Sequence, residues 1–366
     1  MTRLQQLFAE QGQSPWLDNI KRSYLRSGEL ARLVGTGIRG VTANPTIFEL
    51  AIAGSADYDE QFRSLTERNL GVEDAYWDLV IDDIENALRI LRPVFEESGG
   101  TDGFVSVELP PSMAHDTAGS IVTARSLHDQ IHEPNLFVKI PASAEGISAI
   151  AQMIGEGRSI NTTLIFSLGR YDQVTEAYLS GLEAHPGDLS DIHSVASFFV
   201  SRVDAEVDGR LERIGGDEAL GLRGKAAVAQ AKLAYRLFRS RFNGSRWEAL
   251  AARGARLQRP LWASTSTKNP AYPDTLYVDS LVGPDTVNTM PEQTIAAFED
   301  HGTSIRTLDA GIDEAKDVFD GLKRLGVDMD DVGTTLEDEG VSGFAKSYDG
   351  LLAALAVKAG DLAAHH

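Results

Sequence analysis

Eight short apolar segments recur along the chain, and residues with helical spacing fill most of the intervals between them. The segments centre near residues 17, 41, 106, 138, 162, 196, 262 and 278. Strands that alternate with helices pair in parallel, and eight such units predict a single (β/α)8 barrel of the TIM type with additional helices. No Pro/Gly/Ser-rich linker and no repeat divides the sequence, so we expect one domain over residues 1–366.

Helical tracts add to the barrel units in three places. Helical spacing predicts insertions near 55–98 and 205–255 and a helical C-terminal extension from about residue 306. Residues 1–14 are predicted to form an amphipathic helix that ends at Pro15, and Leu276–Leu281 to form the eighth strand. The sequence beyond about residue 305 carries no functional motif that we can assign.

The composition is that of a globular protein with an acidic surface. Of 366 residues, 42 % are hydrophobic, and 34 Lys+Arg stand against 54 Asp+Glu, a net charge of −20. This balance argues against a nucleic-acid or membrane partner and means that an anionic substrate needs a local basic site. With no cysteine, disulfides, thiolate catalysis and cysteine-ligated metals are excluded. The N-terminus lacks the apolar core of a signal peptide, so we expect a cytoplasmic protein.

One charged residue interrupts the apolar segment Leu136–Ala142. Lys139 lies between Val138 and Ile140, where an unpaired ammonium group would be costly to desolvate. One interpretation is a lysine on a sheet edge, where it blocks aggregation. The other is a lysine in a low-dielectric pocket that acts as a nucleophile towards a carbonyl group.

Polar residues interrupt or end nearly every predicted strand. Each alone is explained by a capped turn or a hydrogen-bonded core amide. The C-terminal ends of barrel strands converge, however, so these residues are predicted to meet at one site. They are Asp18, Asn44, Glu108, Lys139, Asn161, Thr163, Ser197, Arg202, Ser264 and Lys268.

The carboxylates among them suit imine chemistry on the lysine. Lys139 can add to a ketone and form an imine that accepts electrons from a breaking C–C bond. Glu108 can move the protons directly or through a water held by Thr163. Asp18 can take the proton from the hydroxyl next to the breaking bond.

The amides and cations suit a sugar phosphate. Asn44 and Asn161 can hydrogen-bond sugar hydroxyls without a change in charge. Arg202 and Lys268 can hold a terminal phosphate, which an otherwise acidic protein would need them to do.

Several segments together resemble the transaldolase family. The segments are Gly40–Phe48, Phe137–Ile147, Ile160–Ser167, Ser197–Arg202 and Trp262–Ser264. The resemblance covers roughly residues 16–300, and the combination of the lysine strand with the Asn-x-Thr strand is specific.

The resemblance implies a TIM-type barrel that moves a dihydroxyacetone unit from sedoheptulose 7-phosphate to glyceraldehyde 3-phosphate in the non-oxidative pentose phosphate pathway. It implies sugar-phosphate partners, no metal or organic cofactor, and a monomer or homodimer. The implied roles are a Schiff-base lysine for Lys139, water-assisted acid/base catalysis for Glu108 and Thr163, acid/base catalysis of cleavage for Asp18, and substrate or phosphate contacts for Asn44, Asn161, Ser197 and Arg202.

One stretch departs from the family pattern. The family has an arginine two residues after the position of Ser264, as a second phosphate ligand. Here Thr265–Asn269 follows, and its only cation is Lys268. A lysine is a point charge and cannot make the bidentate contact of an arginine.

Three alternatives stay open at this point. An aldolase would release the three-carbon unit to water instead of to a second sugar. A metal-dependent barrel lyase or hydrolase would use Asp18 and Glu108 as ligands or as an acid/base pair. A non-catalytic barrel would bind sugar phosphates without turnover.

Two further motifs are interpreted as structural. Gly35–Gly40 spells G-x-G-x-x-G, but the order of predicted elements is helix then strand, the reverse of a dinucleotide site. His128 and His132 lie four apart on a predicted helix, and we interpret them as a solvated helix face because no third ligand is linked to them.

Overall fold

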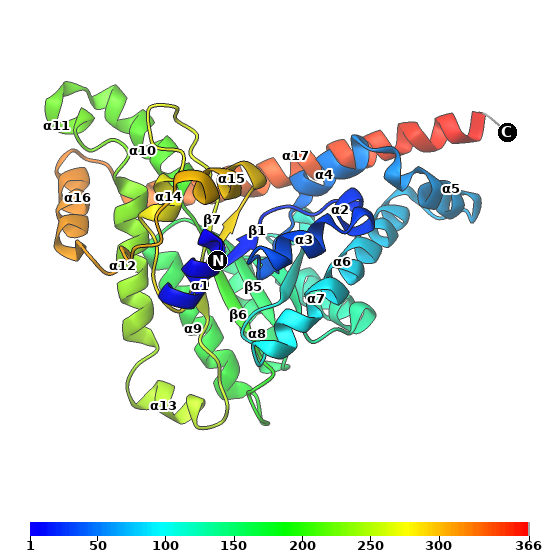
Figure 1. The fold of residues 1–366 in the computed structure, drawn as a ribbon, viewed down its shortest axis with the longest axis horizontal. Helices are drawn as coiled ribbons and strands as arrows, with labels where there is room; N and C mark the ends of the chain where they lie inside the picture. Colours follow the sequence, from blue (N-terminus) through cyan, green and yellow to red (C-terminus); the bar gives the residue numbers. More distant parts are fainter. Residues whose placement is uncertain (365–366) are drawn as a thin grey trace.

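In the computed structural model, which describes residues 1–364, eight parallel strands close into a barrel, as predicted (Figure 1). Each strand pairs with the next, and the last pairs with the first. The strands are β1 (Gln13–Leu17), β2 (Gly40–Val41), β3 (Phe104–Glu108), β4 (Leu136–Pro141), β5 (Ile160–Ile165), β6 (Ser194–Phe199), β7 (Arg259–Ala263) and β8 (Thr286–Met290). The (β/α)8 fold class is therefore confirmed.

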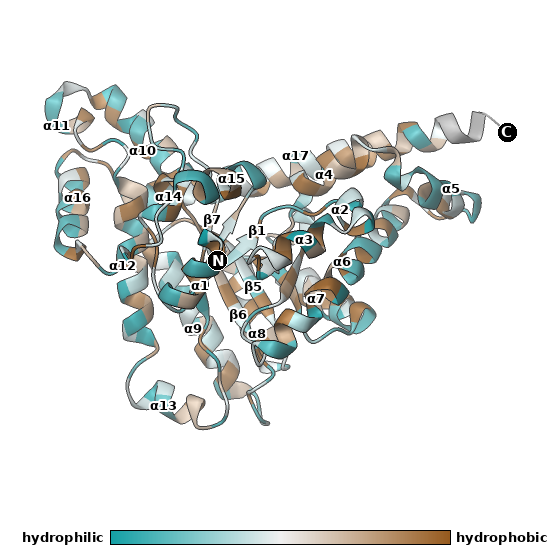
Figure 2. Cartoon of the chain, viewed as in Figure 1, coloured by the Kyte–Doolittle hydropathy of each residue, from teal (hydrophilic) through white to brown (hydrophobic). Residues whose placement is uncertain are grey.

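Helices surround the barrel, and most of them carry both hydrophobic and hydrophilic residues (Figure 2). The first nine are α1 (Arg3–Gln11), α2 (Arg22–Ser27), α3 (Glu29–Gly35), α4 (Pro45–Ala53), α5 (Asp59–Glu67), α6 (Val72–Glu97), α7 (Thr117–Ile131), α8 (Ala144–Gly155) and α9 (Leu168–Ala184). The others are α10 (Ser201–Ile214), α11 (Gly216–Leu220), α12 (Ala226–Arg241), α13 (Ser245–Ala251), α14 (Leu276–Asp279), α15 (Glu292–His301), α16 (Ile312–Arg324) and α17 (Met329–Ala364). The assignment of residues 1–366 to one domain stays a prediction.

The predicted eighth strand was wrong. Leu276–Leu281 contains the short helix α14, and β8 follows at Thr286–Met290. The run Leu276–Leu281 resembles a strand because it contains the apolar residues Tyr277, Val278 and Leu281, which are buried. The true strand β8 is also buried, but several of its residues are polar. Those residues are hydrogen-bonded inside the barrel wall: Gln13 Nε2 donates to Thr286 Oγ1 at 2.9 Å, and Asn288 Nδ2 donates to Tyr277 O at 3.2 Å.

The first helix ends earlier than predicted. Gly12, with a φ of 68°, closes α1 and donates its N–H to Phe8 O at 2.9 Å. Glycine adopts this left-handed conformation without steric cost, so the helix ends there. Pro15 lies inside β1 instead, and its carbonyl accepts from Arg39 N at 2.9 Å.

A buried carboxylate closes the end of the barrel where the strands begin. Asp102, in the loop before β3, is fully buried. Its Oδ2 accepts from Ser14 Oγ and from Arg39 Nε, both at 2.7 Å. Its Oδ1 accepts from Trp16 Nε1 at 3.2 Å and from Arg259 Nη2 at 3.1 Å. Four donors from three segments therefore meet on one side chain.

The long helix α17 runs across the molecule, from beside α10 to the C-terminus near α5 (Figure 1). It packs against α4, α6, α10 and β5. A buried stripe with helical spacing faces the barrel: Val332, Leu336, Gly340, Phe344, Tyr348, Leu351 and Leu355. Gly340 allows close approach, since a Cβ there would lie 3.0 Å from Leu164 Cδ2 on β5.

Candidate active site

Lys139 lies in β4 and is 4 % exposed. Its register partner on β3 is Glu108, and Lys139 Nζ donates to Glu108 Oε2 at 2.9 Å and to Ala43 O at 3.2 Å. A closed barrel has no sheet edge, so the interpretation of Lys139 as an edge lysine was wrong. The amine is instead held inside the barrel beside a carboxylate.

Glu108 is buried with one oxygen still available. Burial raises the pKa of its carboxyl group, and the ion pair with Lys139 offsets part of that rise. Within the described residues, neither Glu108 Oε1 nor Thr163 Oγ1 has a hydrogen-bond partner, although both atoms are buried. A buried oxygen without a partner is unfavourable, and these two can hold a water or a substrate hydroxyl.

Asp18 follows directly after β1. Its Oδ1 accepts from Thr42 Oγ1 at 2.7 Å, and that hydroxyl also lies 2.7 Å from Thr289 Oγ1. Burial raises the pKa of Asp18, whereas the Thr42 hydrogen bond and the positive charges of Lys139, Lys268 and Arg202 lower it. Asp18 is therefore a carboxyl group whose ionisation depends on a hydrogen bond and on nearby cations.

The two predicted amides differ in their surroundings. Asn161 is fully buried: it donates to Ser106 Oγ at 3.0 Å and accepts from Ser197 Oγ at 2.7 Å. Asn44 caps α4 by accepting from Ile47 N at 3.0 Å, and its side chain also lines the cavity beside Lys139. Asn161 is therefore a hydrogen-bonded core amide. Asn44 is half-buried, caps a helix and also lines the cavity.

A cavity of about 280 Å³ opens at the C-terminal ends of the strands. Eight of the predicted site residues line it: Asp18, Asn44, Lys139, Thr163, Ser197, Arg202, Ser264 and Lys268. Glu108 instead contacts Lys139 from the neighbouring strand, and Asn161 lies next to Ser197.

Two cations occupy one side of this cavity. The Arg202 guanidinium lies 5.5 Å from the centre of the Phe199 ring, and burial lowers the pKa of Arg202. Its guanidinium makes no hydrogen bond to any residue in the described part of the chain. Lys268 is exposed and donates to Ser266 Oγ at 2.8 Å. The site therefore presents a half-buried cation with free donors and a second, exposed cation.

Known proteins are similar to this sequence over almost all of its length. A transaldolase of Acidothermus cellulolyticus is 53 % identical over 352 residues, which cover 94 % of each chain. A transaldolase of Thermobifida fusca is 51 % identical over 367 residues, with 99 % of each chain covered. The chain belongs to the transaldolase family. It is accordingly an enzyme of the transaldolase type.

The transaldolase likeness extends further along the chain than the motifs predicted. The family model described as Transaldolase/Fructose-6-phosphate aldolase matches residues 15–355, whereas the motifs covered roughly 16–300. A protein of Streptomyces coelicolor named Transaldolase 1, 49 % identical over 356 residues, covers 96 % of this chain. Most of α17 therefore belongs to the family pattern.

Sequence reasoning missed several residues that line the transaldolase cavity. They are Thr42, Thr46, Ile47, Phe199, Ala263, Ser266, Thr289, Pro291, Gln293 and Phe344. Phe344 comes from α17, which the sequence left without a role. Its position in a buried stripe repeating every three to four residues was the available signal, because such a stripe must pack on another surface.

The motifs interpreted as structural have simple surroundings. Gly40 starts β2 after α3, and a Cβ on it would lie 2.4 Å from Trp16 Cδ2, so close packing explains the glycine. His128 is half-buried rather than solvated, and its Nε2 lies 3.1 Å from Ser159 O. His132, with a φ of 49°, is the C-cap of α7; it is exposed, as predicted, and lines the same surface pocket as His128.

The described residues contain neither a cluster of metal ligands nor a helix suited to cross a membrane. Within residues 1–364, no three His, Cys, Asp or Glu side chains are arranged to hold a metal ion. None of the helices described there has the length and apolar character needed to cross a membrane.

Proposed function

We propose that this chain transfers a dihydroxyacetone unit from sedoheptulose 7-phosphate to glyceraldehyde 3-phosphate, giving erythrose 4-phosphate and fructose 6-phosphate. The intermediate is a Schiff base on Lys139, and the reaction belongs to the non-oxidative pentose phosphate pathway. The observation that carries the proposal is a buried lysine amine, 2.9 Å from a carboxylate and at the wall of a cavity with cations. Membership of the transaldolase family supports it.

Imine formation is the first step. After it has given a proton to Glu108, the amine of Lys139 adds to the ketone carbon of the donor, and the oxygen leaves as water once it has gained protons. Glu108 accepts a proton from the amine over the 2.9 Å contact and returns it to the departing oxygen. Thr163 Oγ1, buried and without a partner in the described residues, suits a water that relays this proton.

Cleavage and transfer follow on the same lysine. Asp18 takes the proton of the hydroxyl next to the breaking C–C bond, and the bonding electrons move to the imine nitrogen. The aldose leaves, and the enamine carbon then attacks the aldehyde carbon of the acceptor. Asp18 returns the proton to the new alkoxide, and water releases the product from Lys139.

The cations provide the phosphate site of the proposal. A protein of net charge −20 repels a sugar phosphate unless cations gather locally, and Arg202 and Lys268 line the cavity together. Arg202 is also the second residue of α10, whose N-terminus has no side-chain cap. The positive end of a helix dipole favours an anion.

Transfer to a sugar, rather than release to water, requires a covered intermediate. Phe344 of α17 is 6 % exposed and lines the cavity. One helical turn further on, Ser347 Oγ lies 2.9 Å from Thr46 Oγ1, which fixes α17 at the same rim. An apolar ring at this position supports the transferase over the aldolase, because it keeps water from the enamine.

The remaining expectations belong to this proposal. An acidic enzyme of central sugar metabolism fits a cytoplasmic location, a single barrel domain and a monomer or homodimer. The roles given to Asn44, Asn161, Ser197 and Ser264 as substrate contacts are proposed on the same basis, with Asn161 acting through its bond to Ser197.

The transfer assay with Lys139→Met tests the proposal. Fructose 6-phosphate and erythrose 4-phosphate are supplied, and glyceraldehyde 3-phosphate is measured with and without a chelator. We expect Lys139→Met to reduce transfer to background, with Lys225→Met, an exposed lysine, as the matched control. Activity that survives Lys139→Met, or that the chelator abolishes, would contradict the Schiff-base mechanism; substrate binding without any turnover would favour the non-catalytic barrel.

A further inference from the structure

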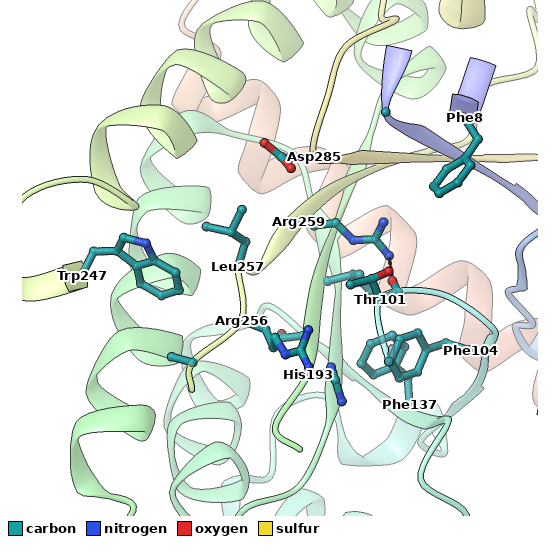
Figure 3. Close-up of a pocket in the computed structure, with 15 residues that line it drawn as sticks. Phe8, Thr101, Phe104, Phe137, His193, Trp247, Arg256, Leu257, Arg259 and Asp285 are labelled. Carbon is teal, nitrogen blue, oxygen red and sulfur yellow. Dashed lines mark hydrogen bonds between the residues drawn. The ribbon is translucent and has the colours of Figure 1, made fainter. Parts of the chain in front are cut away.

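A second cavity, of about 370 Å³, lies at the opposite end of the barrel from Lys139. Figure 3 shows the residues that line it. Its walls come from the segments where strands begin: Phe104 of β3, Phe137 of β4 and Arg259 of β7 line it, as does His193, which precedes β6. It is larger than the candidate active site of about 280 Å³. Ligand sites in proteins are concave, mostly apolar and equipped with a few polar groups, and this cavity has those properties.

Flat apolar surfaces make up most of the wall. The rings of Phe104 and Phe137 stack with their centres 4.2 Å apart. Trp247 and Leu257 lie on the other side of the cavity in Figure 3. A planar ring can therefore contact aromatic and aliphatic side chains at once, the arrangement in which aromatic groups gain most from burial.

His193 is a buried polar side chain without a partner. It is 6 % exposed, its ring packs 5.1 Å from that of Phe104, and within the described residues neither ring nitrogen makes a hydrogen bond. Burial and the positive charges of Arg256 and Arg259 lower its pKa to about 3, so the imidazole is neutral and offers one N–H. A neutral donor in a buried position suits an acceptor brought by a ligand.

Arg256 supplies an unbalanced positive charge next to this ring (Figure 3). Its only hydrogen bond in the described part of the chain runs from Nε to Ser190 O, at 3.3 Å. The other two charges of the lining are opposite in sign: Arg259, which shares Asp102 with Arg39, and Asp285, which pairs with Arg239 at 3.5 Å. The lining therefore retains one positive charge, which matches a monoanion better than a dianion.

We propose that this cavity binds a small aromatic carboxylate, with the ring against Trp247 and Leu257 and the carboxylate on Arg256 and the His193 N–H. The site is separate from the transaldolase reaction, and the proposal does not depend on the Schiff-base mechanism. A guanidinium with free donors recognises the two oxygens of a carboxylate through paired hydrogen bonds.

Calorimetric titration of the full chain with benzoate tests the proposal, with benzamide as the uncharged probe of the same shape. We expect benzoate to bind with a dissociation constant on the order of 1 mM or tighter, and benzamide about tenfold more weakly. Arg256→Gln should weaken benzoate binding about tenfold or more, whereas Arg236→Gln, an exposed arginine outside the lining, should not. In NMR spectra, benzoate should shift the His193 ring signals.

Two results would overturn the proposal. The first is benzoate binding that is absent, or that Arg256→Gln leaves unchanged. The second is benzoate binding that competes with fructose 6-phosphate, because that would place the probe on Arg202 in the active site. Benzoate binding that does not compete with fructose 6-phosphate and that is lost in Arg256→Gln supports the proposal.

Discussion

At the scale of single residues, the site is organised by one cation between two carboxylates. Lys139 is hydrogen-bonded to Glu108, and its charge also lowers the pKa of Asp18, which burial alone would raise further. Both carboxyl groups have pKa values above their ordinary range because they are buried. Small changes in their hydrogen bonds should therefore move the pH dependence of the reaction.

Thr42→Val should shift the acid limb of the pH–rate profile upwards. The Thr42 hydroxyl stabilises ionised Asp18, so its loss raises the pKa of Asp18 further. Cleavage needs the ionised form, and the pH at which kcat/KM for the donor falls should rise by about one unit.

The pH profile of kcat/KM for fructose 6-phosphate is the measurement. Thr46→Val is the control, because Thr46 lines the same cavity but contacts Ser347 rather than Asp18. An acid limb that stays in place, or moves to lower pH, in Thr42→Val would remove Asp18 from the proposed role.

Arg202→Ala should separate phosphorylated from unphosphorylated donors. The Arg202 guanidinium is half-buried with free donors, so its loss should lower kcat/KM for fructose 6-phosphate by about 100-fold. Unphosphorylated fructose should be almost unaffected. Lys268→Ala should cost about tenfold or less, because Lys268 is exposed and acts as a point charge. Equal losses for the two donors would mean that Arg202 does not hold the phosphate.

The sequence predicted which residues gather at the site better than it predicted the contacts that they make. Lys139 was identifiable because a charge in an apolar strand needs an explanation, and the converging strand ends placed Asp18, Arg202 and Lys268 with it. The register that sets Glu108 opposite Lys139 depends on strand pairing, which residue types alone do not specify. The hydrogen bonds of the Asn161 side chain likewise depend on Ser106 and Ser197, which lie on two other strands.

At the scale of elements, α17 contributes more than its sequence indicated. Its buried stripe places Phe344 in the cavity, while Arg170 Nε on α9 donates to Glu337 Oε2 at 3.1 Å and anchors the preceding turn. No local motif marks this role, because it arises from where the helix packs. The eighth strand was missed for the opposite reason: its side chains are polar although they are buried, and only their hydrogen bonds to Gln13 of β1 and Tyr277 of α14 explain their burial.

Phe344→Ala should change the fate of the intermediate. Opening the cavity lets water protonate the enamine, so release of dihydroxyacetone without an acceptor should rise about tenfold relative to transfer, equivalent to about 1.4 kcal/mol between the competing barriers. Both rates are measured from fructose 6-phosphate, with and without an aldose acceptor.

Two variants control for the packing loss in Phe344→Ala. Phe344→Leu keeps most of the apolar volume and should retain a ratio near that of the parent protein. Tyr348 lies in the next turn of α17, and its hydroxyl donates to Glu73 Oε1 at 2.8 Å. Tyr348→Phe removes this hydroxyl and should leave the ratio of release to transfer unchanged. If release and transfer fall together in Phe344→Ala, the ring has only a structural role.

At the scale of the whole molecule, the two ends of the barrel are built differently. The C-terminal end holds the cavity with Lys139, whereas at the N-terminal end Asp102 and its four donors join the strand starts beside the second cavity. The alternation of strands and helices was enough to predict this architecture, since parallel strands with helical crossovers close in few ways. The closing carboxylate was not predictable, because its partners come from distant parts of the chain.

Asp102→Asn should destabilise the whole barrel. It removes the charge that compensates Arg39 and Arg259 and leaves both cations without a full partner, so the free energy of unfolding should fall by about 3 kcal/mol or more. Urea unfolding measures the loss. Asp129→Asn, which breaks an exposed pair with Arg158, should cost less than about 1 kcal/mol. Similar losses in the two variants would contradict a closing role for Asp102.

The most direct test of the proposed mechanism is borohydride reduction in the presence of fructose 6-phosphate, followed by peptide mass mapping. An imine on Lys139 predicts a reduced three-carbon adduct on the peptide that contains this residue, and none in Lys139→Met. An unmodified Lys139 in protein that still turns the substrate over would contradict the Schiff-base mechanism.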